Sequence, residues 1–234
     1  MKTHTRVVVI GGGVVGCSVL YHLTKLGWSD VMLIERSELT SGSTWHAAGG
    51  FHTLNGDTNM AALQGYTIRL YKELEAITGM SCGLHHVGGI TLADNQARFE
   101  QLKAERAKHR YMGLDTEILG PEEIEKFTYG MVNLKGIVGA LYDPLDGHLD
   151  PSGTTHAYAK AARMGGAEIV LHNRVLETNP TAEGWEVVTE KGTVYCEHLV
   201  NAGGLWAREI GAMAGVYLPL LPMAHQYLVT DDIP

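Results

Sequence analysis

Three glycines near the start of the chain have the spacing of a nucleotide-binding turn. They are Gly11, Gly13 and Gly16, and Glu35 follows about 20 residues further on. In such a motif the first glycine allows a tight turn, the second lets a pyrophosphate approach the backbone, and the third lets a helix pack against a strand. The N–H groups at the helix start bind phosphate, and the acidic residue accepts hydrogen bonds from ribose hydroxyls. The motif predicts a dinucleotide site and leaves NAD and FAD both open.

A loop of small and hydroxyl-bearing residues, Ser41–Gly50, contains the second chemical feature, His46. The hydroxyl and N–H groups of such a loop can reach phosphate, and its small side chains can admit a flat ring. Because imidazole is neutral for much of the time near pH 7, His46 could attack an electrophilic flavin methyl carbon. The alternative is an ordinary loop histidine. An NAD-dependent dehydrogenase would give neither the loop nor the histidine a role.

The segment Asn201–Ala207 is a third place where backbone could meet a cofactor. A predicted strand ends in Ala202, Gly203 and Gly204, and a helix is expected from about Trp206. A close crossing of helix and strand would explain the same pattern without a ligand, so this motif is weaker than the first.

The elements that must position these motifs begin with a strand, a helix and a strand. Val7–Ile10 is a short β-branched run, typical of a strand buried on both faces. The apolar period then becomes helical, and Gly27 suits the position just past the helix C-terminus. Val31–Ile34 predicts the second strand of a βαβ unit. The helix positions expected to be buried are Val15, Val19, Leu23 and Leu26.

The rest of the chain alternates between helical and strand-like patterns. Helices are expected at 58–77, at 95–110, from Pro121, and from Pro151 to about residue 164, with Asp150 as a cap. Strands are expected at 87–92, 137–142, 168–171, 174–178, 185–189, 193–195, 198–201 and 226–230. This order of elements indicates an α/β fold.

Composition excludes several classes of function. Lys+Arg number 18 against 26 Asp+Glu, a net charge of −8, which argues against a nucleic-acid surface or a polybasic membrane anchor. No apolar run approaches the roughly 20 residues of a membrane-spanning helix. Cys17, Cys82 and Cys196 are too far apart for a zinc motif. The adjacent pair His85–His86 points to opposite strand faces, so no metal site is predicted, and we expect a soluble protein of a reducing compartment.

At this point the residues resemble a known family, the FAD-dependent amine oxidoreductases of the D-amino-acid-oxidase superfamily, and within it the dimethylglycine and sarcosine dehydrogenases. The tryptophan–histidine run of the small-residue loop is the most diagnostic piece. The matching segments, which occur in family order over nearly the whole chain, are 9–16, 42–49, 146–151, 201–207 and 222–227.

The resemblance implies that FAD is the cofactor and that His46 carries it covalently through the flavin 8α methyl group. It also implies that Val175 contacts adenine through its backbone. The further residues that would line the FAD, besides Gly11, Gly13 and Gly16, are Val14, Val15, Glu35, Arg36, Gly42, Ser43, Thr44, Trp45, Ala47, Ala48, Gly49, Gly50, Ala202, Gly203 and Trp206.

The resemblance also implies a reaction, the oxidation of an N-methylated glycine-type amine by hydride transfer to flavin N5. His225 is expected near the substrate face of the flavin, and Tyr227 accompanies it as a second catalytic candidate. A strand that simply packs is the alternative for both. The implied partners are a small N-methyl amine, an electron acceptor that is either oxygen or an electron-transfer flavoprotein, and tetrahydrofolate in a longer protein.

The implied architecture is a Rossmann-type, doubly wound FAD-binding domain built from 1–79 and 143–215, with a mixed-sheet substrate domain built from 80–142 and 216–234. Because family members are longer, we expect a fragment or a half that needs a partner, with the C-terminal part of the substrate domain incomplete. A non-catalytic regulatory or assembly subunit with the same fold is the alternative function. The expected compartment is the cytoplasm, or the mitochondrial matrix if a transit peptide was removed.

Overall fold

The computed structural model describes residues 1–53 and 55–231, which form two compact units. Unit 1 consists of Met1–His46 and the chain from Ala162 on, and unit 2 of Ala47–Ala161. The boundary near residue 161 falls inside helix α5 (Pro151–Met164). The two units are defined by their internal contacts and not by what they bind. The division into an FAD-binding domain and a substrate domain therefore stays a prediction.

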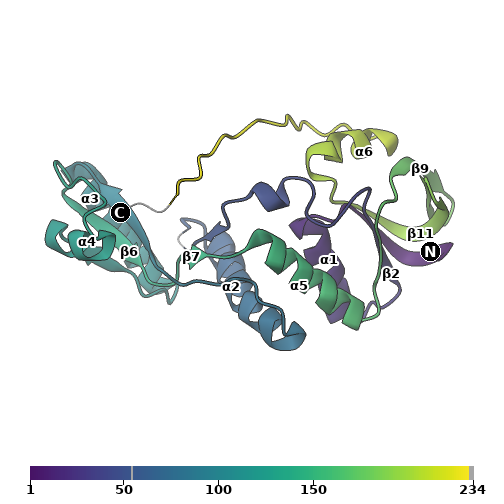
Figure 1. Ribbon diagram of the computed structural model, residues 1–234. Coiled ribbons are helices and arrows are strands. Elements are labelled where there is room, and N and C mark those ends of the chain that lie inside the picture. The colour runs from purple at the N-terminus through teal and green to yellow at the C-terminus, as the bar shows by residue number, and fades with distance from the viewer. Residues whose placement is uncertain (54, 232–234) are drawn as a thin grey trace. The chain divides into compact units, whose positions relative to one another are not determined.

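The centre of unit 1 is a six-stranded mixed sheet with the strand order β8-β2-β1-β11-β10-β9 (Figure 1). β8, β2, β1 and β11 are parallel to one another, whereas β10 pairs antiparallel with both β11 and β9. The predicted α/β fold is therefore confirmed. The strand bounds are β1 His4–Ile10, β2 Val31–Ile34, β8 Glu168–Val170, β9 Val175–Thr181, β10 Gly184–Thr189 and β11 Gly192–Asn201.

Helix α1 (Val14–Lys25) connects β1 to β2 and packs on both strands. Gly27, with φ +88°, ends it as predicted, and Trp28 N–H donates to Leu23 O at 2.9 Å. Of the four residues on the predicted apolar stripe, Val19 and Leu23 are partly buried, whereas Val15 is 63% exposed and Leu26 75% exposed. The small face of the helix lies against the sheet instead, because Gly16 lets its backbone approach the β1 turn. The buried α1 residues are Gly16, Cys17, Leu20 and Tyr21.

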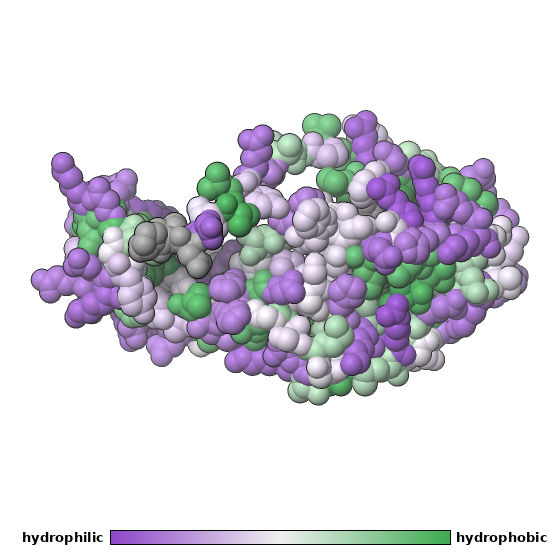
Figure 2. Space-filling view, viewed as in Figure 1, coloured by the Kyte–Doolittle hydropathy of each residue, from purple (hydrophilic) through white to green (hydrophobic). Residues whose placement is uncertain are grey.

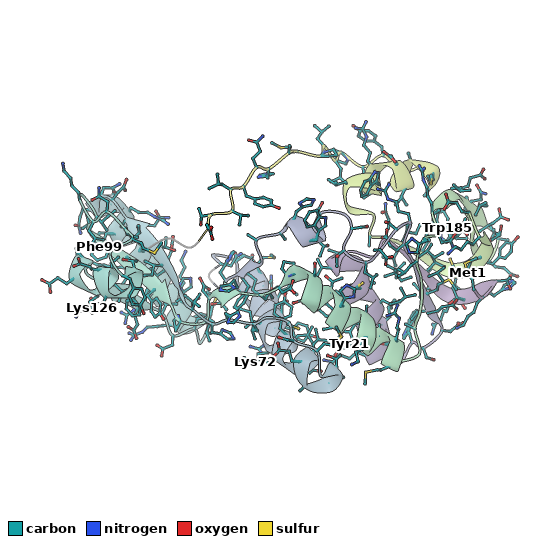
Figure 3. All side chains as sticks on the ribbon, in the orientation of Figure 1. Met1, Tyr21, Lys72, Phe99, Lys126 and Trp185 are labelled. Carbon is teal, nitrogen blue, oxygen red and sulfur yellow. The ribbon has the colours of Figure 1, made fainter. Side chains whose placement is uncertain are left out.

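The two strands predicted at 193–195 and 198–201 are one continuous strand, β11, which changes partner along its length. Its first half pairs with β10, and its second half pairs with β1 up to Asn201 opposite Ile10. Beyond it come a short 3-10 helix η2 (Gly204–Trp206) and helix α6 (Ala207–Met213), which confirms the helix expected near Trp206. Trp185, labelled in Figure 3, packs against the apolar cluster of this sheet.

Unit 2 contains a three-stranded antiparallel sheet with the order β4-β6-β5. Helix α3 covers it, and Phe99 (Figure 3) packs with buried Leu102 and Leu141. A two-stranded ladder joins β3 to β7. The bounds are β3 Gly50–Phe51, α2 Thr58–Thr78, β4 Gly89–Ala93, α3 Gln96–Tyr111, β5 Glu117–Leu119, α4 Pro121–Thr128, β6 Gly139–Asp143 and β7 Gly147–His148.

The strand predicted at 226–230 is absent from the structure, where residues 214–231 contain neither helix nor strand. Among the described residues no other strand pairs with this segment, and an extended chain without a ladder is not a strand. Its apolar side chains are left in solvent, with Leu228 84% and Val229 83% exposed, and Figure 2 shows apolar surface along this segment. Within the described part of the chain, no helix is long and apolar enough to cross a membrane.

Candidate dinucleotide site

The glycine turn between β1 and α1 is so tightly packed that two of its glycines are sterically required. Gly11 has φ +113°, and a Cβ there would lie 2.3 Å from Ala202 O. A Cβ on Gly16 would lie 1.9 Å from Gly11 O. The first and third motifs of the sequence therefore meet at the carboxyl ends of neighbouring parallel strands, the edge where α/β sheets bind ligands.

Glu35, directly after β2, is fixed beside this turn. Its Oε2 accepts a hydrogen bond from Gly12 N–H at 2.6 Å, and its Oε1 accepts one from Ser37 N–H at 2.9 Å. The residue is 9% exposed. A carboxylate has about four lone-pair directions, so each oxygen keeps capacity for a further donor such as a ribose hydroxyl. Sequence reasoning expected the ribose role but missed the two backbone bonds.

The small-residue loop folds back onto the start of α1. Thr44 Oγ1 accepts a hydrogen bond from Val14 N–H at 3.1 Å, and a Cβ on Gly13 would lie 3.0 Å from the same oxygen. Thr40 N–H donates to Gly12 O at 3.0 Å and carries the left-handed φ of +70°, an outlier for a β-branched residue. Strained residues cluster at functional sites, and no pattern in the sequence indicated Thr40.

Arg36 lies flat on the indole of Trp206, with the guanidinium carbon 3.6 Å from the ring centroid. A Cβ on Gly42 would lie 3.5 Å from the same indole, so the loop passes over the ring. Three residues predicted to contact the cofactor, far apart in sequence, are therefore packed together in unit 1. A stacked guanidinium keeps its in-plane N–H donors free to bind phosphate.

Asn201, the last residue of β11, holds the segment that carries Trp206. The Asn201 Nδ2 donates to Ala207 O at 2.8 Å, and the Asn201 Oδ1 accepts from Gly203 N–H at 3.1 Å. A Cβ on Gly203 would lie 2.3 Å from Ile210 Cδ1, so the close crossing considered as the ligand-free alternative is present as well. The sequence placed Asn201 in the motif without this capping role.

His46 ends the short 3-10 helix η1 (Thr44–His46), and its ring lies against Trp45 with centroids 3.8 Å apart. Its Nδ1 is 3.4 Å from the hydroxyl of Tyr227. The structure thus brings together the predicted flavin-bearing histidine and one of the two catalytic candidates. His225, the other candidate, is exposed. Ser43 lies in the same loop, and its carbonyl accepts the N–H of His46 at 3.2 Å.

The remaining predicted contacts are placed within their own units. Val175, the first residue of β9, is 8% exposed and belongs to the core of the sheet in unit 1. Gly49 in unit 2 has φ +76°, and a Cβ there would lie 2.2 Å from Leu149 O. The unit 2 part of the loop, Ala47–Gly50, is exposed except for intermediate Gly49 and leads into β3.

Burial keeps one nearby group chemically inert. Desolvation raises the pKa of Cys17 to about 12, and its thiol donates to Gly12 O at 3.7 Å. No group of three metal-ligating side chains occurs among the described residues. His85 lies against His148 with centroids 5.0 Å apart, whereas His86 meets Phe51 edge-on.

These features fit the adenosine diphosphate half of a dinucleotide. The glycine turn itself carries no side chains, the acidic group is held at the end of β2, and a cation lies at the same edge of the sheet. Gly11 and Gly16 are required by their close approach to backbone, and Gly13 by its approach to the Thr44 hydroxyl.

Comparison with known proteins agrees with this geometry. Mouse dimethylglycine dehydrogenase, mitochondrial, is 41% identical over 100% of this chain, and human sarcosine dehydrogenase, mitochondrial, is 38% identical over 100% of it. The chain spans only 27% and 26% of those relatives. The mitochondrial pyruvate dehydrogenase phosphatase regulatory subunit of mouse is 33% identical over 98% of this chain, and this chain spans 26% of its length.

Solved structures share the fold. L-proline dehydrogenase from P. horikoshii superimposes with a TM-score of 0.85 at 27% identity, over 92% of this chain and 57% of that one. Glycine oxidase from Geobacillus kaustophilus superimposes with a TM-score of 0.78 at 26% identity, over 92% of this chain and 59% of that one. The model of the DAO family, described as FAD dependent oxidoreductase, matches residues 6–234. The chain therefore belongs to the DAO family of FAD-dependent oxidoreductases.

Proposed function

We propose that the chain is the FAD-binding part of an enzyme that oxidises an N-methylated glycine-type amine, dimethylglycine or sarcosine. The observation that carries the proposal is the meeting of the glycine turn, Glu35 and the Arg36–Trp206 stack at one edge of the sheet. The choice of substrate is supported by the relatives named dimethylglycine and sarcosine dehydrogenase, which match the whole chain.

Each residue of the edge would have a distinct task toward FAD. Apart from that of Val14, which donates to Thr44, the N–H groups at the start of α1 would bind the diphosphate. Glu35 would accept the ribose hydroxyls, and Arg36 would supply positive charge. Val175 would contribute backbone beside adenine. The loop from Gly42 to Gly50 would follow the cofactor toward the isoalloxazine.

FAD supplies the redox chemistry when bound, by accepting a hydride equivalent from the amine methyl carbon. The protein must present that amine in its neutral form, because a protonated nitrogen has no lone pair to support hydride loss. The imidazole of His225 can accept the amine proton near neutral pH. Tyr227, two residues further on, would orient the amine through its hydroxyl.

We further propose that FAD is attached to the ring of His46. The support is that this ring lies within the loop that packs over Trp206, where it contacts the ring of Trp45 and the hydroxyl of Tyr227. Denaturing electrophoresis under ultraviolet light after acid treatment should show a fluorescent band at the size of the chain. His46→Ala should abolish the band, and the matched loop variant His52→Ala should keep it.

A colourless wild-type band from flavin-replete cells would remove the covalent bond from the proposal. An absorbance band near 450 nm in the native protein separates the flavin proposal from an NAD-dependent dehydrogenase, because nicotinamide does not absorb there.

The second candidate function is a non-catalytic regulatory subunit, favoured by the 33% identity to the phosphatase regulatory subunit. Turnover of dimethylglycine or sarcosine with an artificial electron acceptor separates it from the enzyme. In the enzyme, oxygen or an electron-transfer flavoprotein would re-oxidise the cofactor, and tetrahydrofolate would act in a longer protein. The compartment would be the cytoplasm or, as for the relatives named mitochondrial, the matrix.

A further inference from the structure

A pair of aspartates in unit 2 holds Thr53 from two directions. The Thr53 hydroxyl donates to Asp143 Oδ2, and the Thr53 N–H donates to Asp146 Oδ1 at 3.0 Å. Asp143 is 1% exposed and Asp146 is partly buried, and their hydrogen bonds to the same residue, Thr53, hold the two carboxyl groups near each other. Thr53 lies about 90 residues away in sequence, so the pair ties two distant segments together.

The surroundings are built closely around the two carboxyl groups. A Cβ on Gly89 would lie 2.2 Å from Asp146 Oδ2, so only glycine leaves the space that this carboxyl occupies. Leu145 N–H donates to Asp143 Oδ1 at 2.9 Å. No ion pair within the described ranges reaches either aspartate. Two adjacent carboxylates without a cation repel each other, which favours keeping one proton between them.

Several titratable side chains lie around the pair. Buried His109 of α3 interacts electrostatically with Asp143, and burial holds the pKa of this histidine below its usual value. His86 Nδ1 lies 3.2 Å from Leu145 O, and the other neighbouring titratable groups are His85, His148, Tyr142 and His52. Burial, and then the charge of Asp143, raises the pKa of Asp146 to about 7.

We propose that Asp143 and Asp146 share one proton and that this pair, by gripping Thr53, positions the loop Ala47–Gly50. Thr53 comes two residues after β3, where Gly50 pairs with His148. With the proton present, Asp146 donates to Asp143, and every remaining carboxyl oxygen can accept from Thr53 or Leu145. Once the proton is lost, two negative carboxylates lie side by side without an ion-pair partner among the described residues, and their mutual repulsion weakens the hold on Thr53.

The aspartates are positioning residues, since neither is assigned a contact with flavin or substrate. Their link to flavin rests on the proposed function, because only that proposal places Ala47–Gly50 beside the ring. The consequence for the whole protein is a loop that is most firmly held below neutral pH and released above it.

The test is a pH titration of the full chain by NMR, with the Asp carboxyl carbons and the Thr53 amide observed between pH 4 and pH 9. We expect the Asp146 carboxyl to titrate about three pH units above an ordinary aspartate, with the Thr53 amide shift following the same midpoint. Asp146→Asn imitates the protonated acid and should fix the Thr53 amide at its low-pH shift across the range. The exposed matched control Asp115→Asn should leave the titration unchanged.

The proposal would be overturned if the Asp146 carboxyl titrates near pH 4. It would also be overturned if the chemical shift of the Thr53 amide does not change with the titration of Asp146. The measurement needs no cofactor, so its failure is distinguishable from a failure of flavin binding. If the chain binds FAD but the Thr53 amide shift does not change with pH, the proposed function stands and the shared proton is refuted. If the Thr53 amide titrates but the chain does not bind FAD, the shared proton stands and the proposed function is refuted.

Discussion

Replacing Gly16 by alanine tests the packing on which the dinucleotide site depends. The new Cβ would lie 1.9 Å from Gly11 O, far inside the 3.0 Å that side-chain carbons essentially never cross. Gly11 cannot retreat freely because its N–H donates to Ile34 O at 2.9 Å. The new Cβ would also lie 3.4 Å from Ala202 Cβ. The clash must therefore displace α1 from the turn.

The two opposing contributions to the free energy of unfolding can be estimated. Overpacking of this kind costs about 3 kcal/mol, whereas alanine in place of glycine favours a helix by about 1 kcal/mol. The net loss is about 2 kcal/mol, which lowers Tm by about 4–8 °C in a chain of this size. FAD binding should fall with it, since the shift moves the N–H groups proposed to bind phosphate.

Thermal unfolding followed by circular dichroism measures the stability, and quenching of flavin fluorescence measures binding. Gly65→Ala is the matched control, because Gly65 also lies within a helix and its Cβ would meet only Arg69 Nη1 at 3.5 Å. That variant should be stabilised by up to about 1 kcal/mol. A Gly16→Ala protein as stable as the wild type, with intact FAD binding, would refute the reasoning.

Three further changes have expected outcomes. Thr44→Val removes the acceptor of Val14 N–H and should cost about 1 kcal/mol in urea unfolding, while Thr44→Ser should cost less than half of that. Glu35→Gln weakens the hydrogen bonds from Gly12 and Ser37 and should lower the free energy of unfolding by about 2 kcal/mol. It should also lower FAD affinity, and an unchanged FAD titration would contradict this. For Asp146, whose folded pKa exceeds its unfolded one, stability should fall by about 2 kcal/mol between pH 4 and pH 7, and Asp146→Asn should flatten that profile in calorimetry.

The sequence predicted the βαβ unit well because its signals are local. A β-branched run, a glycine turn and Gly27 each specify their own backbone, so β1, α1 and β2 were found near their observed ends. The buried face of α1 was missed because the pattern counts large apolar side chains. Close packing against the turn instead favours small residues such as Gly16 and Cys17.

What failed depends on partners distant in sequence. The continuity of β11 needs two different neighbours, β10 and then β1, which no local pattern contains. The strand predicted around Tyr227 has the right composition, but a strand also requires a ladder. Thr53 and its two aspartates are likewise invisible in the sequence, because about 90 residues separate the donor from its acceptors.

The same distinction divides the candidate site itself. The residues proposed to bind the adenosine diphosphate, Gly11, Glu35, Arg36 and Trp206, are held by backbone bonds and stacking within one sheet edge. The residues proposed to act on the amine lie on the segment after α6, where the Tyr227 hydroxyl is 3.4 Å from His46 Nδ1. On the proposed function, affinity for the nucleotide half would therefore reside in unit 1, and turnover would additionally require the segment around Tyr227 to be fixed against the flavin ring. Substitutions at the sheet edge should accordingly weaken binding and turnover together, and substitutions at His225 should lower turnover alone.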